Sequence, residues 1–549
     1  MPNAAYADLV LTGGRIFTAD AARTWAEALA VKDGRLVAVG GDRDVQELIG
    51  PGTRHIALRG RTVTPGFQDA HVHPSIGGLA RIRCELHDAH GKDEYLAIIA
   101  AYAAANPDLP WILGGGWALA DFPGGRPHRE DLDRIAGNRP VILVNRDGHD
   151  AWASSAALAI AGITKDSPDP AHGRIARDDD GTPMGTLHEG AMDIVLAHVP
   201  EDTEEDMRRA ILESQRYFHS LGITAFQDAW MTPVAQAAYE RLASDDLLTA
   251  RVIGAQWWER ERGLEQIDEF VERRSHGVVG RFAATSVKLM TDGIIENQTA
   301  SMTEPYLDPH GHATTNRGID FIDPEILKQA VVRLDALGFQ PHFHSLGDRA
   351  VRQALDAVEA ARHANGWSDT RPHLVHLQVV HPDDRPRFRL LGAVANIQPY
   401  WAVLEDQMTE LTLPILGPVV SARQYPFRSL RAAGATMAMG SDWSVSTPDP
   451  FLQMEVAVTR VSDESRGIRE PFIPGEALEL ADILAAATAG SAYVNHLDDT
   501  GTLAVGKLAD LAILDRDLFD AGQGAIGETH VLATFVEGVA VHEVPGLDG

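Results

Sequence analysis

The stretch RTVTPGFQDAHVH (residues 61–73) decides how the rest of the chain is interpreted. It is a short apolar run that ends on two histidines separated by one residue. Such a run is typical of a buried strand. Side chains at positions i and i+2 of a strand point to the same face, so we expect His71 and His73 to lie side by side at its carboxyl end.

Seven further apolar runs have the same design, because each ends in polar residues and precedes a helical pattern. They are GITAFQDAW (222–230), RVIGAQWW (251–258), TSVKLMTDG (285–293), FQPHFHSLGD (339–348), HLVHLQVV (373–380), AVANIQPYW (393–401) and ATMAMGSDW (435–443). Eight βα units at this spacing predict an α/β fold, a (β/α)8 TIM-like barrel. An open doubly wound sheet is disfavoured, because no Gly-rich dinucleotide or phosphate-binding motif follows any of these strands.

The two chain ends have a different pattern, with short strands around Gly-Gly or Asp-Gly turns. We therefore expect a β-sandwich domain built from residues 1–62 and 490–549, with the barrel spanning residues 63–489. The segment after the first barrel strand is too long for one connection and contains strands of its own. Residues 75–210 are therefore predicted to form an inserted α+β subdomain.

The composition argues against several classes of protein. The chain has 549 residues with 48 Lys+Arg against 78 Asp+Glu, a formal charge of −30 that disfavours binding to nucleic acid or to an anionic membrane. Its single cysteine, Cys84, excludes an intrachain disulfide and a cysteine-rich zinc site. The sequence shows neither a signal peptide nor a run apolar enough to span a membrane. We therefore expect a cytoplasmic enzyme.

Imidazole and carboxylate groups gather at the predicted strand ends. His342 and His344 lie in the fifth run, His373 and His376 in the sixth, and Asp442 ends the eighth. A barrel of this type has its active site at the carboxyl ends of its strands, and these groups are the ligands of zinc or another divalent metal. One His-x-His pair could equally be two surface histidines, so the convergence of four strands carries the prediction. Long polar loops near 294–323, 402–428 and 444–472 are expected to cover this end.

Several motifs make the chain similar to a known family. They are VTPGFQDAHVHP (63–74), DGHDAWASSAAL (147–158), VKLMTDG (287–293), HSLGDRAV (344–351), VHLQVVHPDD (375–384), NIQPYW (396–401), GSDWSVS (440–446) and GTLAVGKLADLAILDRD (501–517). Together they resemble the amidohydrolase superfamily, in particular the amidohydrolase-3 (YtcJ-like) branch that includes N-substituted formamide deformylases. The resemblance covers essentially the whole chain and implies a metal-dependent hydrolase.

The resemblance also implies a set of metal ligands and a role for each. The expected ligands are His71, His73, Lys288, His344, His376 and Asp442. The first-strand histidines and Asp442 would hold the more buried ion, and Asp442 would also handle protons. Lys288 would be carboxylated by CO2 and bridge two ions, and the remaining histidines would hold the second. The implied cofactor is one or two divalent ions per chain, with zinc favoured.

Two of these assignments have alternatives, and one motif departs from the family. An unmodified Lys288 would be cationic and could instead turn toward a carboxylate such as Asp292. His342 lies on the same strand face as His344 and competes for the ligand role, although the motif favours His344. The family's usual Glu-His-Ala-Gln reads VHLQ at residues 375–378, so a polar neighbour of the ligand is missing.

The expected reaction is hydrolysis of an exocyclic C–N bond in an amide or formamide. A divalent metal lowers the pKa of bound water to about 7, and the resulting hydroxide would attack the carbonyl carbon, with Asp442 as the proton shuttle. Tryptophans at the strand ends, Trp230 and Trp257 among them, indicate a pocket for a bulky, rather apolar small molecule, although rim packing explains any single one. The expected substrate-binding residues are Trp117, His149, Trp401 and Trp443.

Two other functions stay open. A heterocycle aminohydrolase (deaminase) is the main alternative, but such members typically carry His-x-x-Glu after the fifth strand, where this chain has Gly347. A non-catalytic, metal-stabilised binding protein is disfavoured because Asp442 and every candidate ligand are present. The expected partner is a small-molecule amide rather than nucleic acid or a membrane, and a homodimer is compatible with the sequence.

Overall fold

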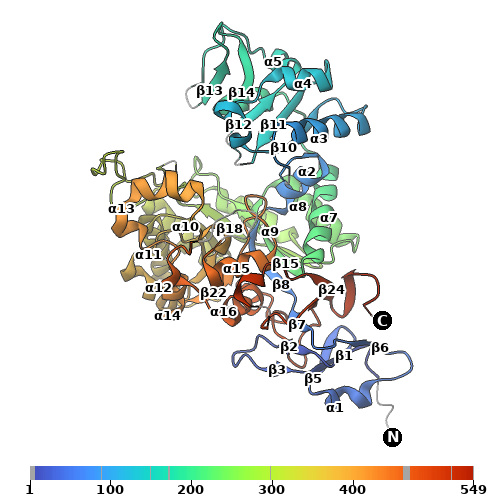
Figure 1. The fold of residues 1–549 in the computed structure, drawn as a ribbon. Coiled ribbons are helices and arrows are strands. Elements are labelled where there is room, and N and C mark those ends of the chain that lie inside the picture. Colours follow the sequence, from blue (N-terminus) through green and yellow to red (C-terminus); the bar gives the residue numbers. More distant parts are fainter. Residues whose placement is uncertain are drawn as a thin grey trace. The chain divides into compact units, whose positions relative to one another are not determined.

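The computed structural model describes residues 6–547 apart from residues 88, 147, 149, 171–172, 297, 462–469 and 521. The chain divides into two compact units (Figure 1). The barrel unit contains Met1–Pro74 together with Gln215–Gly549, and the inserted unit contains Ser75–Ser214. Each unit has its own sheets and its own hydrophobic core.

Within the described residues, eight parallel strands form the central sheet of the barrel unit. In order along the sheet they are β8 (Phe67–Val72), β15 (Ile223–Met231), β16 (Arg251–Trp257), β18 (Phe282–Met290), β19 (Gln340–Ser345), β20 (His373–His376), β21 (Val394–Ile397) and β22 (Thr436–Met439). Each corresponds to one of the eight apolar runs, so the predicted barrel fold is confirmed.

The two end strands of this sheet, β8 and β22, meet at their carboxyl ends. The Asp442 N–H donates to His71 O (2.8 Å), and the His73 N–H donates to Trp443 O (2.7 Å). Gly440 makes the close approach possible, because a Cβ at this position would lie 2.6 Å from the Cβ of His71. These contacts nearly close the barrel, and they do so at the residues expected to bind metal.

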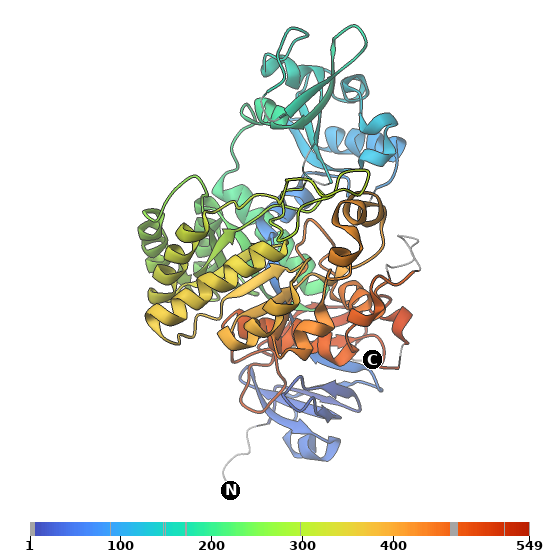
Figure 2. The same cartoon turned by 90° about the vertical axis from the view of Figure 1, so that its left-hand side faces the viewer.

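Helices cover the outer face of the strands (Figures 1 and 2). The longest of them, α11 (Asp348–Asn365), buries Val351, Leu355 and Val358 at spacings of three and four residues, so one side of it is apolar. This side packs in one core with residues of α10 (Pro324–Ala336). Further helices of the unit are α8 (Pro233–Ser244), α9 (Gln266–His276), α12 (Arg385–Leu391), α14 (Phe427–Ala432), α15 (Pro450–Thr459) and α16 (Leu480–Ala485).

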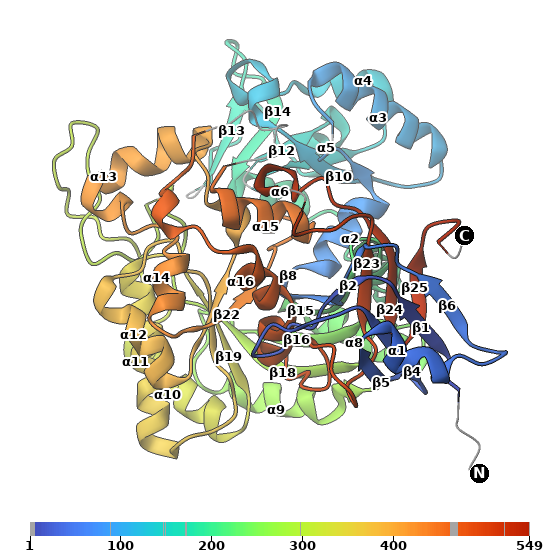
Figure 3. The ribbon, with the colours of Figure 1, turned by 60° about the horizontal axis from the view of Figure 1, so that its bottom comes forward.

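Strands from both chain ends form a β-sandwich in the same unit, as predicted (Figure 3). One sheet has the order β5 (Arg35–Gly40), β4 (Ala28–Lys32), β1 (Leu9–Thr12), β6 (Arg54–Ala57). The other has the order β25 (Val539–Glu543), β24 (Val531–Val536), β23 (Leu511–Leu514), β7 (Thr62–Pro65), β2 (Arg15–Phe17), β3 (Trp25–Ala26). Leu29, Val63 and Phe535 share one core, which joins the two sheets.

The inserted unit is an α+β structure around a six-stranded sheet. Its order is β13 (Gly173–Arg177), β14 (Pro183–Glu189), β12 (Asp150–Ala153), β11 (Val141–Asn145), β10 (Ile112–Trp117), β9 (Cys84–Glu85). Helices α3 (Lys92–Ala105) and α4 (Arg129–Ala136) contribute Tyr95 and Leu132 to its core, beside Trp117 and Trp152. Cys84 is buried and free in this core, and burial raises the pKa of its thiol to about 12, as expected for an inert cysteine.

The long loops after the middle barrel strands pack on each other. The Leu307 N–H, in the loop after β18, donates to Ile415 O (2.8 Å) in the segment after β21. Around this contact, Met302, Leu346 and Leu416 belong to a small hydrophobic core of their own. The loops therefore form a packed layer that begins at the carboxyl ends of the strands. No helix in the described parts of the chain is long and apolar enough to cross a membrane.

A buried charge cluster connects the barrel to the sandwich, and it can be tested by substitution. Arg251, in β16, contacts the carboxylates of Asp510 and Glu537, and Asp510 is almost fully buried. Arg251→Met leaves that carboxylate without its cation, so we expect a loss of about 3–5 kcal/mol in the free energy of unfolding. Urea unfolding followed by circular dichroism measures it. The matched control, Arg333→Met, removes an exposed ion pair with Asp268 and should cost less than about 1 kcal/mol. Equal losses would contradict the prediction.

Candidate metal centre

The first barrel strand delivers two ligands, and a carboxylate beneath them orients the strand. Asp69 is buried two residues before His71, so its side chain lies on the same face. Its Oδ1 accepts the N–H groups of His71 (3.1 Å) and Ser441 (3.0 Å), and its Oδ2 accepts the Ser441 hydroxyl. Asp69 thus joins β8 to the segment that carries Asp442.

Three candidate ligands converge at this junction. Asp442 Oδ1 lies 3.1 Å from His71 Nε2 and 2.9 Å from His73 Nε2. The ligand atoms of the three residues all lie within 4.8 Å of one another. Asp442 has a φ of +58°, an uncommon value for a residue other than glycine, so its side chain is aimed by a tight backbone turn just after β22.

The electrostatic surroundings keep Asp442 ionised. Burial by itself would raise the pKa of this carboxyl group. The imidazole nitrogens of His71 and His73, 3.1 and 2.9 Å from the carboxylate, outweigh burial and hold the pKa of Asp442 well below its usual range. Burial lowers the pKa of His71 to about 3, so this imidazole is neutral at pH 7 with a lone pair available for a metal.

The second group of expected ligands adjoins the first. The rings of His344 and His376 lie 4.4 Å apart, and the ring of His376 lies 5.0 Å from that of His71. Lys288, on β18, pairs in register with His342 on β19 and is buried. The structure therefore places His344 and His376 next to the first group, with Lys288 buried on the strand beside that of His344.

Lys288 has no hydrogen-bond or ion-pair partner within the described part of the chain. Burial lowers the pKa of its amine to about 7, against the opposing effect of the Asp442 charge. The alternative partner, Asp292, is otherwise engaged, because its carboxylate accepts the N–H groups of Ser301, Leu346 and Gly347 at 2.8–3.1 Å. The structure therefore does not support a lysine that turns away to Asp292.

The donor set fits a divalent metal. Buried ring nitrogens without a hydrogen-bond partner among the described residues include His73 Nδ1, His344 Nε2 and His376 Nδ1. Buried polar atoms normally have partners, so several orphaned imidazole nitrogens around one carboxylate indicate that a cation completes the site. Neutral imidazole and carboxylate ligands suit zinc and its neighbours among the divalent metals.

His342 has a different place from its neighbour His344. His342 Nε2 lies 2.8 Å from His71 Nδ1, the ring nitrogen of the candidate ligand that faces away from Asp442. A metal-binding histidine usually has such a partner on its second nitrogen, which sets the tautomer and orients the ring. His342 is therefore suited to support His71, and this placement favours His344 as the ligand.

A second layer of polar side chains continues inward from His342, and the sequence had indicated no role for its amide residues, Asn396 and Gln398. The ring of His373 lies 3.9 Å from that of His342, and its Nδ1 lies 3.2 Å from Asn396 Nδ2. Gln398 donates to Asn396 Oδ1 (3.2 Å) and accepts the His376 N–H (2.6 Å). The layer thus connects the supports of two candidate ligands. The alternating polar positions 342 and 344, and 396 and 398, are the sequence signal that could have revealed it.

Substitution of His342 tests this support. His342→Leu removes the acceptor beside His71 Nδ1, so we expect the affinity for zinc to fall about 10–100-fold. His342→Gln keeps an oxygen acceptor and should retain most of the affinity. Competition against a chromophoric chelator measures affinity without turnover, and His310→Leu, in an exposed loop, is the control. Equal affinities of the Leu and Gln variants, with both folded, would refute the supporting role.

The predicted substrate-binding residues fall into different environments. Trp401 stacks on the ring of His376 at 5.2 Å and 13°, beside the cluster. Trp443 is buried against Tyr217 and Phe218. Trp117 has no exposed surface, and its indole N–H donates to Leu143 O inside the inserted unit, so the structure supports packing rather than substrate contact for this residue. His149 lies outside the described residues.

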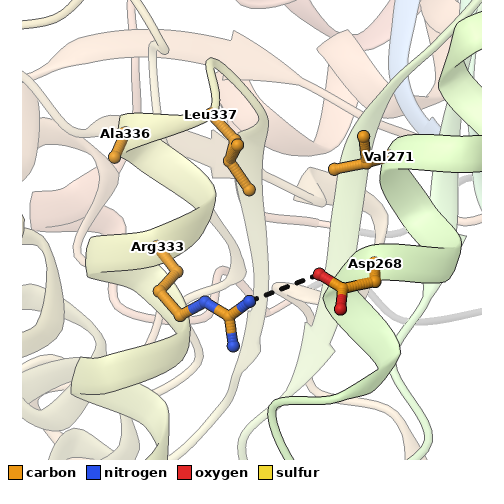
Figure 4. A pocket seen from close by; sticks show the side chains of 5 residues that line it. All are labelled: Asp268, Val271, Arg333, Ala336 and Leu337. Carbon is orange, nitrogen blue, oxygen red and sulfur yellow. Dashed lines mark hydrogen bonds and ion pairs between the residues drawn. The ribbon is translucent and has the colours of Figure 1, made fainter.

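A surface hollow of about 510 Å³ lies elsewhere on the barrel unit (Figure 4). Asp268 and Val271 of α9 and Arg333, Ala336 and Leu337 of α10 line it, so it lies between two outer helices. None of the candidate ligands borders it. The hollow is therefore separate from the histidine cluster.

Comparison with known proteins identifies the family. The model of the amidohydrolase family matches residues 54–542, so the chain belongs to this family and is a metal-dependent hydrolase. Protein LONG AFTER FAR-RED 3 of Arabidopsis thaliana is 31% identical over 98% of this chain and 92% of its own length. N-substituted formamide deformylase of Arthrobacter pascens is 28% identical over 98% of this chain and 99% of its own. The crystal structure of an uncharacterized metal-dependent hydrolase from Pyrococcus furiosus, 25% identical, superposes with a TM-score of 0.74 over 93% of this chain and 99% of that one.

Proposed function

We propose that this protein hydrolyses an exocyclic C–N bond, in an amide or formamide, of a bulky and rather apolar small molecule. The observation that carries the proposal is the Asp442 carboxylate held against the ring nitrogens of His71 and His73 at the barrel mouth. The N-substituted formamide deformylase, similar to this chain over nearly its full length, supports the choice of bond. Water is consumed, and the products are a carboxylate and an amine.

In this reaction the residues of the chain have separate roles in metal binding and proton transfer. His71, His73 and Asp442 would hold the more buried ion, with His344, His376 and Lys288 around a second. A divalent metal supplies Lewis acidity, which makes water acidic near neutral pH and polarises a carbonyl. Asp442 accepts the proton of the attacking water and returns it to the departing nitrogen, because its oxygen is ionised and lies among the ligands.

The position after β19 argues against the deaminase alternative. The fourth residue from His344 in its motif, where the deaminases have glutamate, is Gly347. A Cβ on Gly347 would lie 2.1 Å from Ser301 O, so the backbone leaves no room for a longer side chain. The chain therefore lacks the acid at this point, and the fold as built could not accept it without moving the loop after β18.

A panel of substrates tests the proposed reaction. The zinc-loaded protein is offered formamides, N-acetyl amines, N-acyl amino acids, lactones and amino-substituted heterocycles, and the release of acid, amine or ammonia is measured. We expect turnover of at least one amide or formamide with an apolar amine. Release of ammonia from a heterocycle, without amide turnover, would overturn the proposal in favour of a deaminase.

Asp442→Asn tests the proton shuttle. The amide cannot accept the proton of water, so we expect kcat to fall by at least about 100-fold with the fold intact. Steady-state kinetics on the best substrate of the panel measures the loss, and circular dichroism with thermal unfolding checks the fold. Substantial residual turnover by the folded, metal-loaded variant would remove Asp442 from this role.

We also propose that Lys288 is carboxylated in the loaded protein. Among the described residues its buried amine has no ion-pair partner, and a protonated amine would oppose a metal among the histidines. The neutral amine nitrogen adds to the carbon of CO2 and releases one proton to solvent, which turns an uncharged group into an anionic ligand.

Bicarbonate should therefore help the metal-stripped protein to reload. We expect more zinc bound per chain with bicarbonate than in CO2-free buffer, and a carbamate signal in the ¹³C NMR spectrum after loading with ¹³C-bicarbonate. Lys288→Met is the control and should respond to neither addition. Equal zinc loading in both buffers together with no carbamate signal would contradict the carboxylation.

A further inference from the structure

Two tryptophans stack at the carboxyl ends of neighbouring barrel strands. Trp230 of β15 and Trp257 of β16 have ring centroids 4.6 Å apart and planes 19° apart. Trp230 is 41% exposed, and Trp257 is partly exposed. Most large aromatic side chains bury their surface, so a stacked pair with an open face needs an explanation beyond packing.

The direction of Trp257 follows from its neighbours. The Gln256 amide donates to Phe270 O on α9, so Gln256 points outward from the barrel. Successive side chains of a strand alternate, which turns Trp257 inward. Trp257 also pairs in register with Lys288, so both residues share the inner face and Trp257 lies beside the histidine cluster.

The direction of Trp230 is set by a buried carboxylate. The pairing of β15 with β16 shifts between Asp228 and Met231, an irregularity that re-aims the side chains there. Asp228 Oδ1 accepts the Trp230 N–H (3.0 Å), while its Oδ2 accepts the Tyr239 hydroxyl (3.1 Å). The backbone that presents Trp230 is therefore anchored to α8 and not a loose loop end.

The adjacent Trp258, unlike the stacked pair, is a tryptophan that packs in the core. Its ring is 1% exposed and packs with Phe270 in the barrel core. The core at the end of β16 is therefore filled without the Trp230–Trp257 stack. On the far side of the barrel, after β21, Trp401 stacks on His376, so the metal ligands lie between two aromatic surfaces.

We propose that the open face of the Trp230–Trp257 stack is a binding subsite for a planar aromatic ring of the substrate. This deepens the proposed function and rests on it, since it places the ring while the C–N bond lies at the histidine cluster. An aromatic ring extends the stack by one layer, with favourable contact between flat polarizable surfaces. A saturated ring of the same size is puckered and makes a poorer contact with the indole face.

Matched substrate pairs separate stacking from general hydrophobicity. Each pair carries a phenyl or a cyclohexyl ring at the same position, on the amine in one series and on the acyl group in the other. For wild type we expect a lower KM for the phenyl member of at least one series. Trp230→Leu and Trp257→Leu should raise that KM about tenfold, with kcat changed less than twofold, and leave the cyclohexyl KM nearly unchanged.

Two further variants control for structure. Trp25→Leu replaces an equally exposed tryptophan, 41%, in the sandwich and should change none of these constants. Trp230→Phe keeps an aromatic face and should recover most of the preference for phenyl. If Trp230→Leu fails to fold, Trp257→Leu and Trp230→Phe still decide the question, because each alters the stack while retaining a large apolar side chain.

A binding experiment works without turnover. Stacked indoles give a paired circular-dichroism band in the far ultraviolet. We expect benzylamine or benzoate to change this band and to quench tryptophan fluorescence more than cyclohexylmethylamine or cyclohexanecarboxylate. Equal responses to the aromatic and the saturated compounds, or equal KM values within every substrate pair, would overturn the subsite. Amide turnover in the same experiments would still support the proposed function. No amide turnover together with selective aromatic binding would overturn the proposed function and leave the stacking surface in place.

Discussion

The junction between the first and the last strand of the barrel is the contact on which the rest depends. Ser441 donates to Asp69 across 372 residues of sequence, and Asp442 donates to His71 beside it. The same short segments that close the sheet carry three of the candidate ligands. Closure of the barrel and assembly of the metal centre are therefore one event, because neither β8 nor β22 presents a complete site alone.

The interior below this junction is polar, which is unusual for a barrel core and has a consequence. Gln227 and Gln340 bond each other across the lumen (2.7 Å), and Asn396 donates to Ala70 O (2.9 Å). Buried polar groups are stable only with partners, so this layer specifies which rotamers are allowed. Many of the buried side-chain nitrogens that have no partner among the described residues belong to the histidine cluster. Ring nitrogens without hydrogen-bond partners are thus concentrated at the place where a cation could bind to them.

Much of this organisation could be predicted from sequence because it depends on local patterns. Eight apolar runs ending in polar residues gave the strand count, and the period of two placed His71 with His73 and His342 with His344. What those patterns could not distinguish is the role of two histidines on one face. That His342 approaches the rear of His71 depends on the register of β19 and on closure of the ring, which are long-range properties. The sequence pattern also could not show that Trp117, at a strand end of the inserted unit, occupies a core position.

The sandwich made from both chain ends affects the order in which the protein can be made. β7 ends at Pro65 and needs β23, which begins at Leu511, as its neighbour on one side. A ribosome adding 5–20 residues per second takes roughly 20–90 s to cover that interval. During this interval, one edge of β7 has no strand to pair with. Unpaired strand edges can pair with strands of other chains and so lead to aggregation. During synthesis there is therefore a long period in which the N-terminal strands could pair with other chains. In this period only a chaperone, or the short sheet that these strands form themselves, protects them.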